Sequence, residues 1–373
     1  MGSNVRVSEN IDLLLDAYDY ELPLERIAQN PVEPRDSARL LVADFQCDRS
    51  HRIFRQLPDL LAPGDLLVLN DTRVIRARLY GRKPSGAQVE VLLLEERSLD
   101  TWLALVKPGK RLKPGAKIEF SPRADSSSAN SAVISTLTAT VLARDEATGG
   151  RIVKFDLPPD TSLVQQLDRF GQVPLPPYIT DSEAPPDRYQ TVYAQHPGSA
   201  AAPTAGLHFT DELLGRLDDR GIDRTFVTLH VGVGTFRPVE TAEITQHKMH
   251  GEWVDVSADT VDKIRQTQAR GGRVIAVGTT VVRSLESAAR GGTLAPFCSQ
   301  TDLFIYPGYR WQVVDGLITN FHLPRSSLLM LVSAMVGRER LLELYREAIE
   351  LEYRFFSFGD AMLLGNGSRG ALV

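Results

Sequence analysis

The stretch RVIAVGTTVVRSLESAAR, residues 273–290, decides the fold of this chain. Its first part, Arg273–Gly278, is a short apolar run that is typical of a buried strand. Its second part, Thr279–Arg290, has the length and apolar spacing of a helix. A buried strand that leads directly into a helix is the repeating unit of α/β proteins, so we expect a sheet covered by helices.

The same alternation extends outward through the second half of the chain. Thr210 and Ser257 each stand directly before an amphipathic run, and we expect each to cap a helix, over Asp211–Arg220 and Ala258–Arg270. The other expected strands are Arg224–Val231 and Leu303–Tyr306, and the other expected helices are Leu328–Val336 and Glu339–Leu351. This order predicts βαβ units and a mostly parallel sheet.

The stretch from Asp65 to Leu157 has a different pattern, with short β-like runs separated by proline and glycine turns. The expected strands are Leu66–Leu69, Gln88–Glu95, Trp102–Val106, Lys117–Phe120, Ala132–Leu142 and Arg151–Phe155. Many short strands with such turns are typical of a small sandwich or barrel. We therefore expect an α/β domain over residues 1–64 and 158–373, and an inserted β domain over residues 65–157.

Composition narrows the class of protein. The chain has 373 residues with a net charge of −5, and its only cysteines, Cys47 and Cys298, form no CxxC pattern. A disulfide framework or a cysteine zinc site is therefore not expected. The apolar run Leu13–Leu15 is too short for a signal peptide or a membrane span, so we expect a cytoplasmic protein with no membrane contact.

The histidines indicate a functional site in the second half of the chain. Six of the seven, all except His51, lie between His196 and His322, beside glycine, proline or threonine turns. Histidine changes protonation near neutral pH, and the ligand crevice of an open parallel sheet lies beyond the carboxyl ends of its strands. A helix that starts at Thr279 would add free N–H groups there. We therefore expect a polar ligand in such a crevice, although each single histidine could equally fill a polar corner.

Two motifs leave alternatives open. His247 and His250 stand three residues apart with Glu252 behind them, which on a helix could hold a metal. Gly251 follows at once and the H-E-x-x-H pattern is absent, so no metal is predicted. Asp71 and Arg73 follow an apolar run and form either a surface turn or part of a site.

A basic segment lies within the expected β domain. Between Arg73 and Lys117 the chain has eleven basic and four acidic residues, a local charge of +7 in a chain of net −5. The densest part contains Lys107, Lys110, Arg111 and Lys113. Such a segment is either a solvated face or a surface that contacts phosphates of a nucleic acid, and the opposite sign of the remainder favours the second.

Long segments of the chain resemble the S-adenosylmethionine:tRNA ribosyltransferase-isomerases of queuosine biosynthesis. The resemblance runs from about Asp19 to Leu364. It departs at Arg76, where the family usually has proline, and at residues 121–131, where a polar loop looks inserted. The segments that carry it include LNDTRVIRARLYG, LVKPGKRLKPGA, YQTVYAQHPGSAAAPTAGLHFT, LHVGVGTFRPV, HKMHGEW, VGTTVVRSLES, TDLFIYPGY, DGLITNFHLPRSSLLMLVSA and FFSFGDAMLL.

The resemblance implies a layered α/β/α domain with an inserted β-barrel. It also implies transfer of the ribosyl moiety of S-adenosylmethionine to 7-aminomethyl-7-deazaguanine at the wobble position of tRNA. Epoxyqueuosine tRNA forms, and adenine and methionine leave. S-adenosylmethionine is then consumed as a substrate, no cofactor is needed, and the expected partners are this tRNA and S-adenosylmethionine, bound by a monomer.

We assign the implied roles to residues of this chain as follows. His208 and His230 would transfer protons, and Asp302 or Glu286 would interact with the amine or the sulfonium. The basic segment would bind tRNA. The expected substrate-binding residues are Asp71, Arg73, Thr204, Gly206, Thr235, His247, His250, Thr279, Arg283, Tyr306, His322 and Arg325, with Arg283 and Arg325 orienting polar groups.

Two other classes of function compete with this one. A metal-dependent hydrolase would use His208, His247 and His250 as ligands. An RNA-binding module would use the basic segment beside an inert α/β domain. Stoichiometric zinc would support the first, and failure to release adenine from S-adenosylmethionine would support the second.

Overall fold

The computed structural model describes residues 10–44, 48–98, 100–123, 135–146, 148–159, 161–232 and 239–365. The helices are α1 Leu57–Leu60, α2 Leu163–Phe170, α3 Asp211–Asp219, α4 Ala258–Ala269, α5 Thr279–Ala288, α6 Ser327–Val336 and α7 Arg338–Glu350. The strands of the large sheet are β1 Arg39–Ala43, β2 Arg49–Ile53, β3 Leu66–Asn70, β13 Asp223–Leu229, β14 Glu252–Val256, β15 Val274–Val277, β16 Phe297–Thr301, β17 Gly316–Asn320 and β18 Ala361–Leu364.

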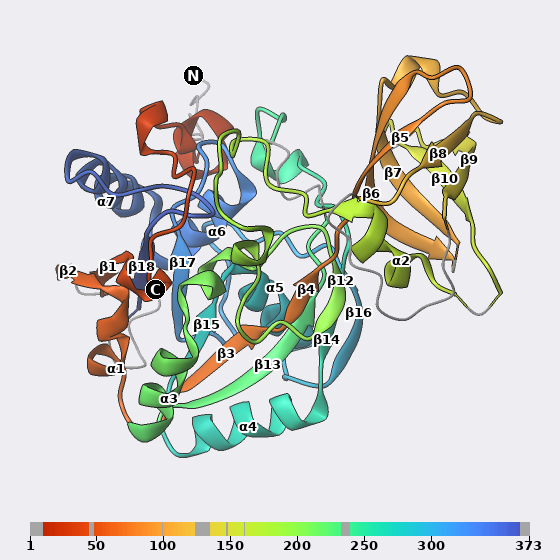
Figure 1. Cartoon of the computed structure of the whole chain (residues 1–373). Coiled ribbons are helices and arrows are strands. Elements are labelled where there is room, and N and C mark those ends of the chain that lie inside the picture. The colour runs from red at the N-terminus through yellow and green to blue at the C-terminus, as the bar shows by residue number, and fades with distance from the viewer. Residues whose placement is uncertain are drawn as a thin grey trace, which may run out of the picture.

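The large sheet has a parallel centre and antiparallel edges (Figure 1). Its nine strands follow the order β16-β14-β13-β3-β15-β17-β18-β1-β2. The central strands β13, β3, β15 and β17 are parallel neighbours. Because β16 and β2 point the same way as these four, six of the nine strands share one direction. The carboxyl ends of the central strands therefore meet at one edge of the sheet.

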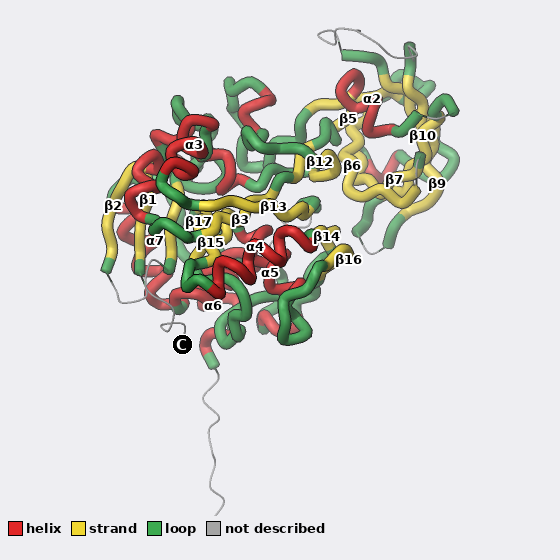
Figure 2. Tube along the Cα trace, turned by 90° about the horizontal axis from the view of Figure 1, so that it is seen from below, coloured by secondary structure: helices red, strands yellow, loops and turns green. Residues whose placement is uncertain are grey.

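Each face of the sheet builds its own core, because successive side chains of a strand point to opposite faces. On β3, Leu66 and Val68 pack with α4, α5, α6 and α7. Leu67 and Leu69 pack with α1 and α3 on the other face. Figure 2 shows α3 on one side of the strands and α4, α5 and α6 on the other. The expected layered α/β/α domain is confirmed.

The inserted β domain is a closed barrel that stands beside the layered domain (Figure 1). Its strands are β5 Arg78–Arg82, β6 Gln88–Ser98, β7 Thr101–Lys107, β8 Lys117–Phe120, β9 Leu137–Arg144 and β10 Arg151–Asp156. They follow the order β5-β6-β7-β10-β9-β8, and β8 pairs back with β5, so no edge is left in this ring. Inward residues such as Val91, Phe120 and Phe155 fill the barrel, and α2 closes it with Leu163 and Leu167.

Two short pairings join the barrel to the layered domain. Strand β12, His196–Ser199, pairs in parallel with β4, Thr72–Val74, and β11, Gly171–Gln172, pairs with β5. Gly171 must lack a side chain, because a Cβ there would lie 1.9 Å from the carbonyl oxygen of Arg76. Arg76 stands where the resembled family usually has proline. Its side chain forms an ion pair with Asp168 at 3.4 Å.

Two expected strands differ from the structure: one belongs to the other sheet, and one is not a strand. Leu66–Leu69, predicted for the β domain, is β3 at the centre of the large sheet, and all five of its residues are buried, as a strand covered on both faces requires. Leu303–Tyr306 forms no strand. The preceding segment Phe297–Thr301 pairs with β14 instead, and the carbonyl of Leu303 accepts from Arg283 Nε at 3.1 Å.

The predicted helix caps are confirmed. Thr210 Oγ1 accepts from Leu213 N at 3.1 Å at the start of α3, and Ser257 Oγ accepts from Thr260 N at 3.2 Å at the start of α4. Within the described ranges, no helix combines the length and the apolar character that crossing a lipid bilayer requires.

Candidate active site

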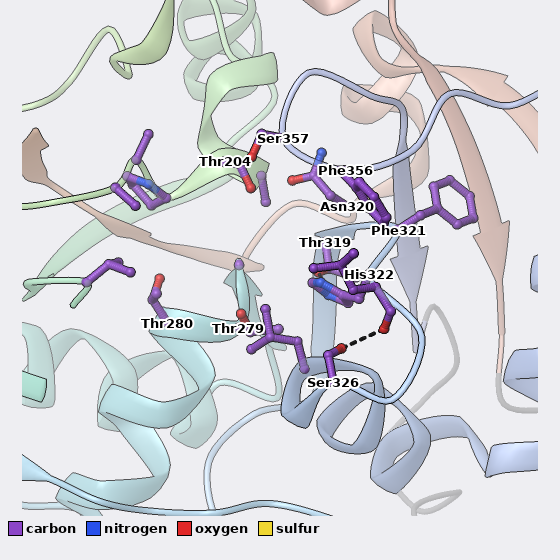
Figure 3. Close-up of a pocket in the computed structure, with 18 of the residues that line it drawn as sticks. Thr204, Thr279, Thr280, Thr319, Asn320, Phe321, His322, Ser326, Phe356 and Ser357 are labelled. Carbon is purple, nitrogen blue, oxygen red and sulfur yellow. Dashed lines mark hydrogen bonds between the residues drawn. The ribbon is translucent and has the colours of Figure 1, made fainter. Parts of the chain in front are cut away.

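A cavity of about 720 Å³, the inner cavity, lies at the carboxyl edge of the central strands (Figure 3). Strand β15 leads into Gly278, Thr279 and Thr280, and β17 ends in Thr319 and Asn320. This is the edge where parallel sheets bind their ligands. The remaining walls come from Thr204, the loop Phe321–Leu323, Ser326 and the pair Phe356 and Ser357.

Local sequence explains why these side chains face the cavity. Gly278 has φ +94°, a conformation that glycine adopts without strain, and it turns β15 directly into α5 at Thr279. Ser326 begins α6: its Oγ accepts from Leu329 N at 3.2 Å and donates to Leu323 O at 2.7 Å, the contact drawn in Figure 3. Both helices therefore start at the rim of the cavity.

The inner cavity is uncharged at neutral pH. Its polar side-chain groups are hydroxyls, one amide and the imidazole of His322, and among the described residues that line it there is no carboxylate, lysine or arginine. Burial lowers the pKa of His322 to about 3, so its ring is neutral, with Nε2 2.8 Å from Thr319 Oγ1. Tyr178, Phe321 and Phe356 supply aromatic surface. Burial of a charge here would cost much more free energy than burial of a flat polar ring whose hydrogen bonds are satisfied.

A second cavity of about 1300 Å³, the outer cavity, lies between the barrel and the layered domain. The barrel contributes Glu95, Glu96 and Trp102, and the layered domain contributes His230 and Trp253. Val231 lines both cavities, so they adjoin at the end of β13.

His230 is held rigidly in the wall of the outer cavity. Its ring stacks on Trp253, with centroids 5.0 Å apart and planes at 19°, and Nδ1 lies 2.8 Å from Thr72 Oγ1. Thr72 Oγ1 also lies 3.5 Å from the carbonyl of His196. Burial, with a smaller contribution from His196, lowers the pKa of His230 to about 4. The neutral ring can therefore accept a proton.

The outer cavity suits a cation. Glu95 and Glu96 line it together with Trp102 and Trp253, and burial raises the pKa of Glu96. Glu95 also forms an ion pair with Arg97 at 3.0 Å. Carboxylates and indole rings both attract positive charge. A third lining carboxylate, Glu252, is already used, because it forms a buried ion pair with Arg283 and accepts from Gly232 N at 3.2 Å.

His208 lies outside both cavities. Its buried ring packs on Phe54, with centroids 4.9 Å apart, and its Nε2 lies 3.2 Å from Asn320 Nδ2. Burial lowers the pKa of His208 to about 4, against a smaller opposing effect of its hydrogen bond with the main chain of Arg35. Asn320 lines the inner cavity, so the histidine reaches that cavity only through the amide.

The two predicted catalytic carboxylates line neither cavity. Glu286 is fully buried in α5 and accepts from Tyr309 Oη and from the main-chain N–H groups of Gln312, Val313 and Val314, at 3.0–3.1 Å. These contacts anchor a loop. Asp302 is exposed and pairs with Arg290 at 3.3 Å on the surface. Both residues therefore lie outside the walls of the two cavities.

Some of the predicted substrate-binding residues line one of the two cavities, and the others lie outside both. Thr204, Thr279 and His322 line the inner cavity, and His250 lines the outer one. Thr235 lies outside the described residues.

The others occupy supporting positions. Asp71 is buried, accepts from Thr228 Oγ1 at 2.7 Å, and has its pKa raised by burial. A Cβ on Gly206 would lie 2.1 Å from Tyr193 Oη, so this glycine permits close packing. Arg325, at φ +56°, pairs with Asp16 and Asp19. The side chains of Arg73, His247, Arg283 and Tyr306 also lie outside the two cavity walls.

The metal alternative lacks its ligand set. His247 and His250 lie on a loop rather than on a helix, and the His247 ring packs on Phe304. Within the part of the chain that the structure describes, no three histidine, cysteine or acidic side chains are grouped to hold a metal ion.

The basic segment forms an exposed loop of the barrel between β7 and β8. Lys107, Lys110, Arg111 and Lys113 are all exposed. Beneath them the buried Arg151 donates from Nη2 to Gly109 O at 2.7 Å and from Nε to Leu112 O at 2.8 Å. The loop backbone is thus fixed while four cationic side chains face solvent.

Four residues of the site were not predicted from the sequence. They are Asn320, Phe356, Trp253 and Thr72, which stand in segments that carry the family resemblance. For Asn320 a signal exists, because polar residues at the end of the apolar run GLITN stand where a parallel strand meets its ligand edge.

Comparisons with known proteins show the family to which the chain belongs. The family model described as "Queuosine biosynthesis protein" matches residues 15–364. A relative from Nostoc sp., named S-adenosylmethionine:tRNA ribosyltransferase-isomerase, is 62% identical over 97% of this chain and 94% of its own length. One of the same name from Thermosynechococcus vestitus is 60% identical over 95% and 96%. The crystal structure of S-adenosylmethionine tRNA ribosyltransferase from Thermotoga maritima is 41% identical, covers 93% of this chain and 99% of that one, and has a TM-score of 0.53.

Proposed function

Because this chain belongs to the queuosine biosynthesis protein family, we propose that its two adjoining cavities form the active site of an S-adenosylmethionine:tRNA ribosyltransferase-isomerase. The chain is an enzyme that transfers the ribosyl moiety of S-adenosylmethionine to 7-aminomethyl-7-deazaguanine at the wobble position of tRNA. The product is epoxyqueuosine tRNA, and adenine and methionine are released.

One observation carries the placement of the substrates: the two cavities adjoin at Val231 and differ in charge. S-adenosylmethionine combines a neutral nucleoside with a cationic sulfonium. The uncharged, aromatic inner cavity fits the adenosine, and the outer cavity, with Glu95, Glu96 and Trp253, fits the sulfonium and the aminomethyl base. The ribose then lies where the cavities meet, with each leaving group on its own side.

His230 is placed to act on the outer side of this junction. The sulfonium acidifies the protons on ribose C5′, so a neutral base can remove one, and the incoming amine must also lose a proton before it attacks. The neutral ring of His230 has one unprotonated nitrogen that can accept a proton, and Thr72 and Trp253 hold the ring in place. We assign proton acceptance to His230.

The barrel holds the tRNA. The exposed cations at Lys107–Lys113 belong to the domain that also supplies one wall of the outer cavity. One chain thus contributes both cavities and the basic loop, which supports a monomeric enzyme. No resident cofactor is needed in this proposal, because S-adenosylmethionine is consumed. The tRNA substrate supports a cytoplasmic location.

Reversing the charge of the basic loop should weaken tRNA binding. Phosphate contacts release counterions, so the Lys110→Glu, Arg111→Glu double variant should bind tRNA at least about tenfold more weakly. The slope of log affinity against log salt should fall by about 0.9 for each lost duplex contact. A filter-binding salt titration measures both. Arg144→Glu, on exposed β9, is the matched control, and equal weakening by that variant would mean that the loop has no specific role.

The reaction itself is tested by its products. We expect adenine and methionine to be released from S-adenosylmethionine only when the tRNA carries 7-aminomethyl-7-deazaguanine. Chromatography of small molecules and mass analysis of the tRNA nucleosides would detect both products. Methylated RNA together with S-adenosylhomocysteine would instead show a methyltransferase and overturn the proposal.

A further inference from the structure

Two buried asparagines end β3 and β17, the strands on either side of β15, and they differ in their hydrogen bonds. Asn70, at the end of β3, uses its whole amide within the protein. Its Oδ1 accepts from Thr72 N and Leu229 N, both at 3.1 Å, and its Nδ2 donates to Leu229 O at 3.0 Å and Thr280 Oγ1 at 3.2 Å. This amide is structural.

Asn320, at the end of β17, uses only half of its amide. Its Nδ2 donates to His208 Nε2 at 3.2 Å and to the carbonyl of Asp360 at 3.4 Å. Its Oδ1 is buried and has no hydrogen-bond partner among the residues that the structure describes. In Figure 3 this oxygen points into the inner cavity, toward Thr204. A buried acceptor without a partner is unfavourable unless a ligand supplies the donor.

The surroundings prevent the amide from turning over. The carbonyl of Asp360 only accepts hydrogen bonds, so the nitrogen of Asn320 must face it. Asp360 is itself anchored, since its carboxylate accepts from Arg39 N at 2.9 Å and from Arg354 N at 2.8 Å. The neutral ring of His208 offers Nε2 as a second acceptor to the same nitrogen. Both contacts hold Oδ1 toward the cavity.

We propose that Asn320 Oδ1 accepts a hydrogen bond from the exocyclic amino group of adenine, and that His208 is the residue that positions this amide. The inference rests on the proposed function of the inner cavity. An ammonium donor does not fit an uncharged cavity. The flat ring of adenine matches its aromatic walls, and the amino group of adenine is an obligate donor. Asn320 is thereby a specificity-determining residue that selects adenine over a 6-oxo purine.

The test compares S-adenosylmethionine with its inosine analogue, in which a carbonyl oxygen replaces the amino group. Single-turnover release of the base is measured with modified tRNA. The native enzyme should prefer the adenosyl substrate by at least about 100-fold, because two acceptors would otherwise face each other. Asn320→Leu should slow the adenosyl reaction and reduce the preference to below about tenfold. A 2′-deoxyadenosyl analogue, which keeps the amino group but lacks one ribose hydroxyl, tests the ribose as the alternative donor. If the preference that Asn320→Leu removes depends on this hydroxyl and not on the amino group, the assignment to adenine is wrong.

A separate set of variants tests the role of His208. His208→Phe keeps the packing on Phe54 but removes the acceptor, so the preference for adenine should fall by about tenfold, and His208→Gln should restore part of it. Asn70→Leu is the matched control, which should destabilise the fold and leave the preference unchanged. If the native enzyme releases no adenine, the proposed function fails. If it releases both bases equally well, only the role of Asn320 fails.

Discussion

Replacing His230 with alanine should lower the single-turnover rate by about 10²- to 10⁴-fold, the usual cost of losing a general base. The ring lines the outer cavity, and Thr72 and Trp253 hold its position. The cations of the basic loop, which we propose bind tRNA, do not line this cavity, so affinity for tRNA should change little. Rapid-quench kinetics and filter binding on the same preparations separate the two effects.

Two further variants show which property of His230 matters. His230→Gln keeps a polar side chain but cannot accept a proton, so it should react as slowly as the alanine variant. His51→Gln, on edge strand β2, replaces a histidine outside both cavities and should react at the normal rate. A His230→Ala protein that melts earlier but turns over normally would reduce this residue to a packing role.

Acid should unfold the layered domain well above the pH at which the carboxylates titrate. Burial lowers the pKa of His208 and His230 to about 4 and that of His322 to about 3. An unfolded chain protonates these rings near pH 6.5, whereas the folded chain keeps them neutral. Below pH 6.5 the unfolded state therefore binds more protons, and stability falls as the pH falls. Each ring costs about 1.4 kcal/mol per pH unit, so the three together cost about 6 kcal/mol at pH 5.

A loss of this size is comparable to the whole stability of many domains. Urea unfolding curves between pH 7.5 and 5 would measure it as a falling midpoint, with about three protons taken up on unfolding. His208→Asn should reduce the uptake by about one proton. A midpoint that stays constant over this range would mean that the three rings are not held neutral in the folded enzyme.

Local sequence predicted much of the fold. The helices α3 and α4 were found with their caps, Thr210 and Ser257, because a cap is a contact between near neighbours. The strand and helix of residues 273–290 were found because burial on both faces leaves a continuous apolar run. The strand Leu66–Asn70 was also found, but its partners were not. Apolar residues indicate burial without saying in which sheet, and β13 and β15, which flank β3, lie about 150 and 200 residues along the chain.

The sequence by itself determined the family, the strand–helix alternation and the edge of the sheet where polar residues gather. Only the tertiary structure decided which of those residues share a cavity. Histidines 208, 230 and 322 look alike in the sequence, yet one supports an amide, one faces the outer cavity and one lines the inner cavity as a neutral ring. Glu286 was predicted to interact with the amine or the sulfonium, and the structure shows that it makes four hydrogen bonds to residues 309–314. Protonation and hydrogen bonding depend on burial and on neighbours from other strands, and no local pattern encodes those contacts.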